Sequence, residues 1–393
     1  MKFTAQDVLP IDATHALLVG RLWQPGIGPT VVVCRDNALF DVTSVAPTVS
    51  QLLDVDTPAA ALRMALATAM KVADLDTVLA NCDESTRDNS KPWLLAPCDL
   101  QAVKASGVTF VASMLERVIE EQARGDLTKA QDIRAALTRI IGDNLAQLKP
   151  GSDDAARVKA ELIQRGAWSQ YLEVGIGPDA EIFTKAPVLA SVGLGADIGI
   201  HPKSVWNNPE PEVVLAVNSR GHVVGAALGN DVNLRDFEGR SALLLGKAKD
   251  NNASCAIGPF LRLFDEHFGI DDVRQTEIAL RVEGSGDGFV MTGSSSLNKI
   301  SRDPLELVSH AYGPTHQYPD GFMLFLGTMF APTQDRHGPG LGFTHEVGDL
   351  VTISAPKLGA LINRVGHSDK IAPWTFGIAA LMTNLAGRGL LRR

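Results

Sequence analysis

Short apolar segments separated by glycine, proline and asparagine fill the chain from about residue 173 onward. Segments of this length and spacing predict strands rather than long helices. The clearest pair, 211–217 and 222–228, is joined by a turn-forming Asn-Ser-Arg-Gly sequence and predicts an antiparallel hairpin. Helices are expected in this half of the chain at 259–268 and 305–311.

The first part of the chain combines strand and helix patterns. Residues 30–42 predict two short strands around an Arg-Asp-Asn turn, and the Ala- and Leu-rich segment 59–79 predicts a helix. We expect residues 1–95 to form a small β-rich N-terminal domain.

The segment 114–170 differs in composition from the rest of the chain. Glu, Lys, Gln, Arg and Ala dominate it, Leu and Ile recur at spacings of three and four, and Pro150-Gly151 interrupts the pattern. This composition is typical of a helical hairpin. The predicted fold class is therefore α+β, mainly β: a main domain over 96–393 with a helical insertion at 114–170, preceded by the small domain.

Composition is that of an ordinary globular protein. The 393 residues exceed one ordinary hydrophobic core, and 45% are apolar and 21% charged. No uninterrupted apolar run reaches the length of a membrane span, and the N-terminus lacks the apolar core of a signal peptide. The four cysteines have no C-x-x-C spacing, which disfavours a zinc site or a disulfide framework. We therefore expect a cytoplasmic protein without a membrane partner.

The net charge of −9 argues against a nucleic-acid-binding surface. It also provides no general attraction for an anionic substrate. Such a ligand would need a bound metal or a few well-placed Lys and Arg side chains.

An acidic motif on the predicted hairpin suggests a metal site. Alternation along a strand places Glu210 and Glu212 on one face, and the hairpin brings Asp231 opposite Glu210. Three carboxylates in one place repel one another unless a cation lies among them, and an all-oxygen cage suits Mg²⁺, Mn²⁺ or Ca²⁺. The alternative is an acidic strand end exposed to water.

Two lysines follow this motif, Lys247 and Lys249. A lysine close to a metal and a bound carbonyl group can transfer a proton or stabilise an enolate. The alternative is a solvated lysine pair on a loop.

These residues together resemble the fumarylacetoacetate hydrolase superfamily. Its pattern is E-x-E on a strand, a later N-D-x-x-x-R-D phrase and a lysine shortly before Gly-Pro, and it also includes an F-x-K and a G-T turn. The matching residues are Glu210, Glu212, Asn230, Asp231, Arg235, Asp236, Lys249, Gly258, Pro259, Phe183, Lys185, Gly327 and Thr328. The resemblance covers roughly residue 95 to the end of the chain and implies a mixed β-roll core that binds Mg²⁺ or Mn²⁺. It also implies a homo-oligomer, a dimer or tetramer.

One departure from the pattern narrows the expected chemistry. Hydrolytic members have a histidine in an H-x-x-E phrase, where this chain has Ser113 followed by Glu116. The phrases at 206–212, 247–255 and 316–321 look closer to the bacterial 2-keto-3-deoxy-pentonate dehydratases. This subgroup implies dehydration of 2-keto-3-deoxy-D-pentonate to 2,5-dioxopentanoate.

By this resemblance, the metal ligands are Glu210, Glu212 and Asp231. A 2-keto acid would chelate the ion, which stabilises the enolate formed when a C3 proton leaves. Lys249 is the expected catalytic residue, and Glu181 is expected to be the second acid/base group unless it is an ordinary surface glutamate. The residues expected to bind the substrate are Arg235, Thr328 and Lys185.

Two other functions remain open. A metal-dependent hydrolase of acylpyruvates would cleave a carbon–carbon bond, and the missing histidine speaks against it. A Ca²⁺-stabilised β module, which is not an enzyme, would use the same carboxylates only to hold its structure. Lys249 would have no role in such a module. The insertion at 114–170 is either a lid over the site or an element of dimer packing.

Overall fold

The computed structural model describes residues 1–124, 148–164, 168–328 and 334–391, together with the single residues Asp126, Lys129 and Pro332. Within α5, the side chains of 111–113, 115 and 120 are not described.

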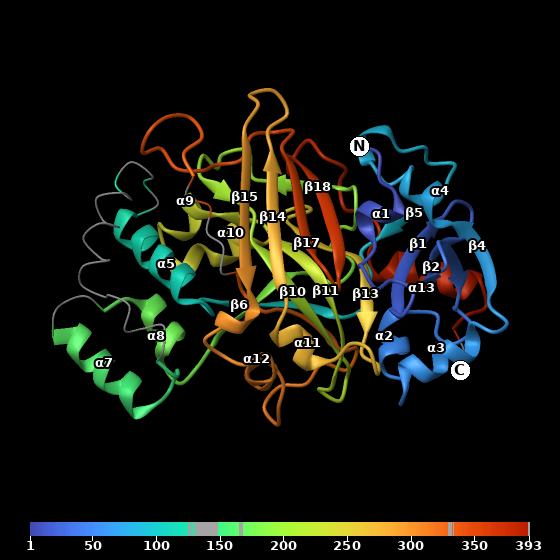
Figure 1. Cartoon of the computed structure of the whole chain (residues 1–393), viewed down its shortest axis with the longest axis horizontal. Coiled ribbons are helices and arrows are strands. Elements are labelled where there is room, and N and C mark those ends of the chain that lie inside the picture. The colour runs from blue at the N-terminus through green and yellow to red at the C-terminus, as the bar shows by residue number, and fades with distance from the viewer. Residues whose placement is uncertain are drawn as a thin grey trace.

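Two sheets form the centre of the molecule (Figure 1). The larger has the strand order β4-β3-β2-β1-β13-β11-β10-β16-β6-β7, with β5 paired to β1. Its strands are β1 (Leu18–Gln24), β2 (Gly28–Arg35), β3 (Ala38–Asp41), β4 (Met70–Asp74), β5 (Trp93–Leu95), β6 (Ala102–Gly107), β7 (Glu181–Ala186), β10 (Pro211–Val217), β11 (Val223–Asp231), β13 (Cys255–Leu263) and β16 (Phe322–Phe325).

The smaller sheet has the order β15-β14-β17-β18-β8 and lies in front of β10 and β11 in Figure 1. Its strands are β8 (Asp197–Ile200), β14 (Glu277–Glu283), β15 (Val290–Ser296), β17 (Leu350–Ala355) and β18 (Gly359–His367), and β9 (Asn207–Asn208) pairs separately with β12 (Asn233–Leu234).

Helices lie around the sheets. They are α1 (Ala5–Val8), α2 (Val49–Leu53), α3 (Pro58–Ala65), α4 (Leu75–Leu79), α5 (Val111–Ala123), α7 (Asp153–Gln164), α8 (Gln170–Ile176), α9 (Arg235–Glu238), α10 (Leu245–Lys249), α11 (Ile270–Arg274), α12 (Pro304–Ala311) and α13 (Ile378–Gly387). Among the described helices, none is both long and apolar enough to cross a bilayer. The α+β, mainly β class predicted from the sequence is confirmed.

Strand β10 is buried on both faces, and its alternate side chains enter two different hydrophobic clusters. Val213 and Leu215 belong to the cluster between the two sheets, whereas Val214 and Ala216 belong to the cluster on the opposite face of the large sheet. The central position of β10 therefore fixes the direction of every side chain along it.

The predicted strands 30–42, the hairpin formed by β10 and β11, and helix α12 are confirmed. The helix expected at 259–268 is wrong, because 259–263 belong to β13 and 264–268 form a turn. A short run of apolar residues buried on both faces has no period that distinguishes a strand from a helix. The segment 59–79 is also more divided than predicted, since β4 separates α3 from α4.

The N-terminal region is joined directly to the rest of the sheet. Val19 on β1 pairs with Leu261 on β13, and α13 returns to this region from the end of the chain. There the side-chain amide of Asn384 donates to the carbonyl of Ile27 at 2.7 Å. Residues 1–95 thus extend the large sheet, and their division into a separate domain stays a prediction.

The described part of the predicted insertion is helical. Val118 and Ile119 of α5 pack against Leu172 and Ile176 of α8 in one buried cluster. Most of the segment between α5 and α7 lies outside the described residues, so its role as lid or packing element stays untested.

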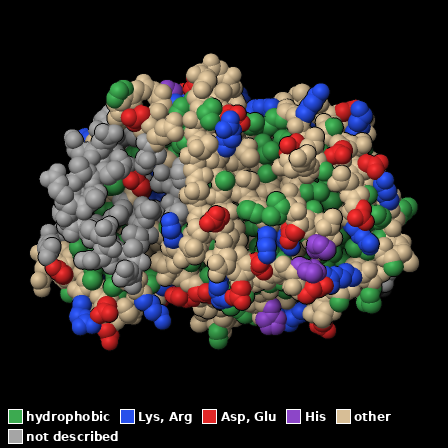
Figure 2. Space-filling model, viewed as in Figure 1, with side chains coloured by type: hydrophobic (Ala, Val, Ile, Leu, Met, Phe, Trp, Pro, Cys, Tyr) green, Lys and Arg blue, Asp and Glu red, His purple; other side chains and the backbone are tan. Residues whose placement is uncertain are grey.

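Charged side chains of both signs are interspersed on the face shown in Figure 2. This face presents no large area of a single sign among the residues described there.

A substitution at Gly229 tests the close packing of the hairpin. A Cβ at this position would lie 2.3 Å from Phe325 Cε1 and 2.5 Å from Val214 Cγ2. We expect Gly229→Ala to lower the free energy of unfolding by about 1–3 kcal/mol, because the core must shift to admit the methyl group. Urea denaturation measures the change, and Gly286→Ala, where nothing lies within 4 Å, is the control. Equal stability of the two variants would contradict this packing.

Candidate active site

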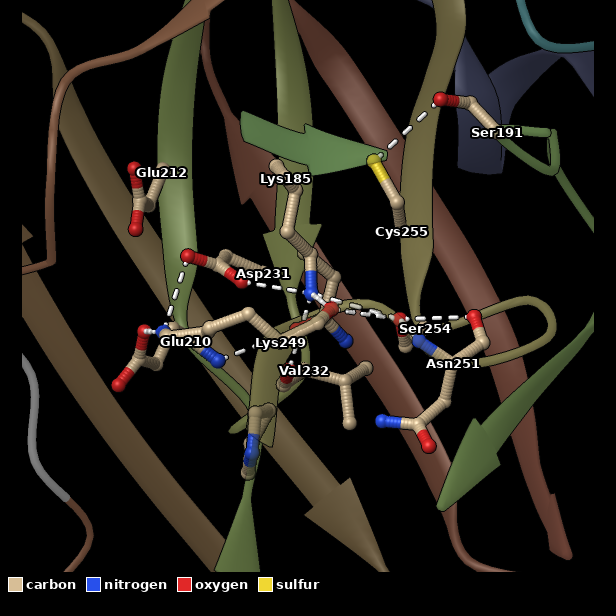
Figure 3. Close-up of polar contacts among 12 residues, drawn as sticks. Lys185, Ser191, Glu210, Glu212, Asp231, Val232, Lys249, Asn251, Ser254 and Cys255 are labelled. Carbon is tan, nitrogen blue, oxygen red and sulfur yellow. Dashed lines mark hydrogen bonds and ion pairs between the residues drawn. The ribbon is translucent and has the colours of Figure 1, made fainter. Parts of the chain in front are cut away.

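The hairpin formed by β10 and β11 brings three buried carboxylates together (Figure 3). Pro211 pairs with Asn230, and the amide of Asp231 donates to the carbonyl of Glu210 at 3.0 Å. Glu210 and Glu212 alternate onto the face that carries Val214, and Asp231 shares that face from the neighbouring strand. One oxygen from each of the three carboxylates lies within 4.8 Å of the others, and the residues are 4%, 1% and 1% exposed.

Two buried lysines face this cluster. Lys249 Nζ lies 2.5 Å from Glu210 Oε2 and 3.0 Å from Asp231 Oδ2. Lys185 Nζ lies 2.8 Å from Asp231 Oδ1 and also donates to the carbonyl of Lys249. Burial opposes the charge on Lys249, but the carboxylates of Asp231 and Glu210 raise its pKa, so the ammonium is the stable form.

Glu212 is the carboxylate without a cationic partner among the described residues. The amide of Gly327 donates to its Oε2 at 2.6 Å. Burial, followed by repulsion from Asp231 and Glu210, raises the pKa of Glu212 well above its usual range. In contrast, Lys249 and Arg117 outweigh the burial of Glu210 and lower its pKa to about 2.

This cluster fits a hard divalent cation. Its donors are all carboxylate oxygens, and the charge of Lys249 is too little to offset the burial of Glu212 and its repulsion from Asp231 and Glu210. The cavity between the carboxylates measures about 20 Å³, which is room for roughly one water-sized species. Glu210, Glu212 and Asp231 would hold Mg²⁺ or Mn²⁺.

Glu181, predicted as the second acid/base group, lines the same cavity from the start of β7. Its side chain packs over Gly107, where an added Cβ would lie 1.9 Å from Glu181 Oε2. Burial, and then the nearby carboxylate of Glu238, raise the pKa of Glu181 to about 7. Glu181 is therefore poised to hold or release a proton near neutral pH.

Two residues of the cavity were missed by sequence reasoning, Arg117 and Glu238. Arg117, on α5, pairs with Glu210, and its Nη1 lies 3.0 Å from Glu238 Oε2. In the sequence, Arg117 directly follows Glu116, the glutamate of the stretch that corresponds to the family's H-x-x-E phrase, and only this position pointed to it. The signal for Glu238 was weaker, since it lies three residues after Arg235 on the same short helix.

The three predicted substrate-binding residues are placed differently. Thr328 lines the cavity next to Gly327. Lys185 is fully buried behind Asp231, away from the described cavity lining. Arg235 is buried beneath Trp206, at 5.5 Å from the ring, and donates to Asn208 Oδ1 at 2.9 Å. It is likewise absent from the described lining, so a direct role for it and for Lys185 stays a prediction.

Comparisons with known proteins agree on one family. The fumarylacetoacetate (FAA) hydrolase C-terminal family model matches residues 194–366. A 2-dehydro-3-deoxy-D-arabinonate dehydratase of Saccharolobus solfataricus is 32% identical over 231 residues, which cover 59% of this chain and 71% of that protein. A probable 2-keto-3-deoxyxylonate dehydratase of Haloferax volcanii is 30% identical over 195 residues, which cover 50% of this chain and 63% of that protein.

Solved structures share the fold. A 2-keto-3-deoxy-D-arabinonate dehydratase in its apo form has a TM-score of 0.61 at 20% identity, covering 89% of this chain and 99% of that chain. A 2-keto-3-deoxy-D-arabinonate dehydratase complexed with magnesium and 2,5-dioxopentanoate has a TM-score of 0.60 at 20% identity, with the same coverage.

The elevated pKa of Glu212 makes metal binding dependent on pH. The carboxylate is the form of Glu212 that binds the metal, so binding must release its proton. The affinity for the metal should therefore rise with pH. It should level off above the pH at which Glu212 of the metal-free protein is already ionised. Titration calorimetry with Mn²⁺ in buffers of different ionisation enthalpy measures this release. Glu212→Gln should weaken binding at least about 10–100-fold, whereas Glu266→Gln, an exposed acid, should leave it unchanged. Binding without proton release would contradict the assignment.

Proposed function

Because the chain belongs to the fumarylacetoacetate hydrolase family, we propose that it is a metal-dependent dehydratase of 2-keto-3-deoxy-D-pentonate (2-dehydro-3-deoxy-D-arabinonate). The product is 2,5-dioxopentanoate. The supporting comparisons are the dehydratases that match this chain at 30% identity or more. The observation that carries the proposal is Lys249, whose ammonium contacts two carboxylates of a cavity that Glu181 also lines.

The metal, when bound, supplies Lewis-acid stabilisation of the enolate of a 2-keto acid. Glu210, Glu212 and Asp231 hold it. Lys185 fixes this arrangement from behind, because its ammonium binds both the carboxylate of Asp231 and the backbone carbonyl of Lys249.

Lys249 and Glu181 perform the proton transfers. The contacts with Glu210 and Asp231 hold a proton on Lys249; once these carboxylates bind a cation, the pKa of Lys249 would fall and its neutral amine would accept the C3 proton. The ammonium formed in this way would face the developing enolate. Glu181, in its protonated form, donates to the departing C4 hydroxyl. Burial, and then the neighbouring carboxylate of Glu238, favour that protonated form.

The substrate carboxylate requires a cation and a hydroxyl group. Arg117 and Thr328 both line the cavity, and we assign both to that carboxylate. Arg235 supports the site through Asn208, the residue that precedes the E-x-E strand by a short turn. A direct contact between Arg235 and the substrate would require it to leave Asn208.

The cell context follows the same proposal. Cys34, Cys82, Cys98 and Cys255 are buried free thiols, which fits a reducing cytoplasm. We propose a homo-oligomer, a dimer or tetramer, by analogy with the family. Mn²⁺ is expected to replace Mg²⁺, since the oxygen cage suits both.

A product assay separates this function from acylpyruvate hydrolysis. With Mg²⁺ present, 2-keto-3-deoxy-D-pentonate should give a five-carbon aldehyde acid that an aldehyde dehydrogenase oxidises to 2-oxoglutarate. Release of pyruvate from an acylpyruvate, with the sugar acid untouched, would replace the dehydratase by a hydrolase.

Lys249 and Lys247 form a matched pair for mutation. Lys249→Met should lower kcat by about 10²–10⁴-fold, because the amine that accepts the C3 proton is lost. Lys247→Met should retain activity, since Lys247 is exposed on the same helix. Circular dichroism and Mn²⁺ binding verify that both variants fold. Similar turnover in the two variants would exclude Lys249 from the chemistry.

The pKa of Glu181 predicts the alkaline limb of the pH profile. Because the acid form is active, kcat/KM should fall as pH rises through about 7. Glu181→Gln should lower turnover by about 10²-fold or more and remove this limb. A variant that keeps the limb would assign it to another group.

A further inference from the structure

One peptide group next to the catalytic cavity is held from both sides. The hydroxyl of Thr109 donates to the carbonyl of Leu326 at 2.7 Å. The N–H of the same peptide group, which belongs to Gly327, donates to Glu212 Oε2 at 2.6 Å. Because a trans peptide is planar, its C=O and N–H point in opposite directions. The hydroxyl of Thr109 and the carboxylate of Glu212 therefore lie at opposite edges of one rigid group.

Thr109 is itself fixed by its surroundings. It is buried, and both the backbone N–H and the hydroxyl of Ser301 donate to its carbonyl at 2.8 Å. The preceding residue, Val108, lines the catalytic cavity and has a φ of 57°, which is unfavourable for a β-branched side chain. Such a backbone conformation persists only where the surrounding contacts enforce it. The contacts of Thr109 thus hold the turn after β6 as well as the peptide group.

Gly327 lets this peptide group pack tightly but does not fix its direction. Its φ of 91° lies in the region that favours glycine, and a Cβ there would lie 2.0 Å from Thr109 Oγ1. Glycine also adopts other backbone conformations readily, so the peptide could turn over. Its carbonyl oxygen would then face the carboxylate of Glu212, which has no proton to donate when it is ionised. The hydroxyl of Thr109 opposes this rotation, because a buried hydroxyl that loses its acceptor is destabilising.

We propose that Thr109 is a positioning residue for Glu212, a proposed metal ligand, and for Thr328. Its hydroxyl holds the peptide group in the orientation that donates to Glu212, and Thr328 directly follows this group in the cavity lining. Groups that hydrogen-bond to a ligating carboxylate influence metal affinity although they do not touch the ion. The effect on metal binding stands independently, whereas the effect on the substrate rests on the proposed function.

Two substitutions of Thr109 separate its hydroxyl from its shape. Thr109→Val removes the hydroxyl and keeps the shape, whereas Thr109→Ser keeps the hydroxyl. In titration calorimetry with Mn²⁺, Thr109→Val should weaken binding about tenfold or more, and Thr109→Ser should stay within about threefold of wild type. Thr276→Val is the matched control and should leave the affinity unchanged, because Thr276 is also buried and its hydroxyl donates to the carbonyl of Asp272 at 3.0 Å. Equal affinity in Thr109→Val and wild type, or equal losses in Thr109→Val and Thr109→Ser, overturn the proposal.

A double-mutant cycle separates positioning from a general loss of structure. In a Glu212→Ala background, Thr109→Val should change the Mn²⁺ affinity by less than about threefold, because its effect passes through the carboxylate that is missing. The same loss in both backgrounds overturns the route through Glu212.

If circular dichroism shows that Thr109→Val does not fold, Ser301→Ala takes its place. It removes one of the two hydrogen bonds to the carbonyl of Thr109 and should weaken Mn²⁺ binding at least about threefold. Unchanged affinity in Ser301→Ala then overturns the proposal.

Turnover tests the part of the proposal that concerns Thr328. At saturating Mg²⁺, Thr109→Val should raise KM for 2-keto-3-deoxy-D-pentonate at least about threefold, because Thr328 directly follows the displaced peptide group. Thr109→Ser should show a smaller rise. An unchanged KM in Thr109→Val overturns this part. Wild-type protein that binds Mn²⁺ but does not dehydrate the pentonate refutes only the proposed function, and calorimetry still decides the role of Thr109.

Discussion

Repulsion among three buried carboxylates is the constraint on which the site depends. One oxygen from each of Glu210, Glu212 and Asp231 lies within 4.8 Å of the others at the buried end of the hairpin, where little solvent screens their charges. Lys249 and Lys185 offset part of this charge. Glu212 forms no ion pair with a described residue, and its pKa stays raised despite Lys249; a divalent ion would supply the missing positive charge.

The large sheet fixes the positions of these carboxylates. The carboxylates lie on two central strands, β10 and β11, whose other side chains are locked into cores on both faces. Sites built on such strands are held more tightly than sites on loops. The opposing groups come from segments distant in sequence: Arg117 from α5, Glu181 from β7 and Thr328 from the segment after β16. Arg117 lies within the predicted insertion 114–170, so this segment contributes directly to the cavity.

Local patterns predicted the centre of the site but not its surroundings. The turn after Val217 and the alternation of Glu210 and Glu212 were sufficient to place Asp231 opposite Glu210, because hairpin register follows from the turn. The only sequence signal for Arg117 was the neighbouring Glu116, and its pairing with Glu210 was not predictable because it depends on how α5 packs against the sheet. Lys185 was recognised by its motif, yet only the fold reveals that it lies behind Asp231. The strand β13 was mistaken for a helix in part because burial on both faces erases periodicity.

The central claim is that these carboxylates hold a catalytic metal rather than a structural one. A structural metal contributes to folding itself, whereas a catalytic metal can be removed from a preformed site. Here Lys249 already binds two of the three carboxylates, which favours a site that stays folded without the ion.

The most direct measurement is to follow far-UV circular dichroism and turnover of 2-keto-3-deoxy-D-pentonate in the same sample while EDTA removes the metal. The account predicts that turnover is lost with the spectrum unchanged, and that Mg²⁺ restores turnover. Loss of the folded spectrum together with the metal would contradict it and assign the carboxylates a structural role.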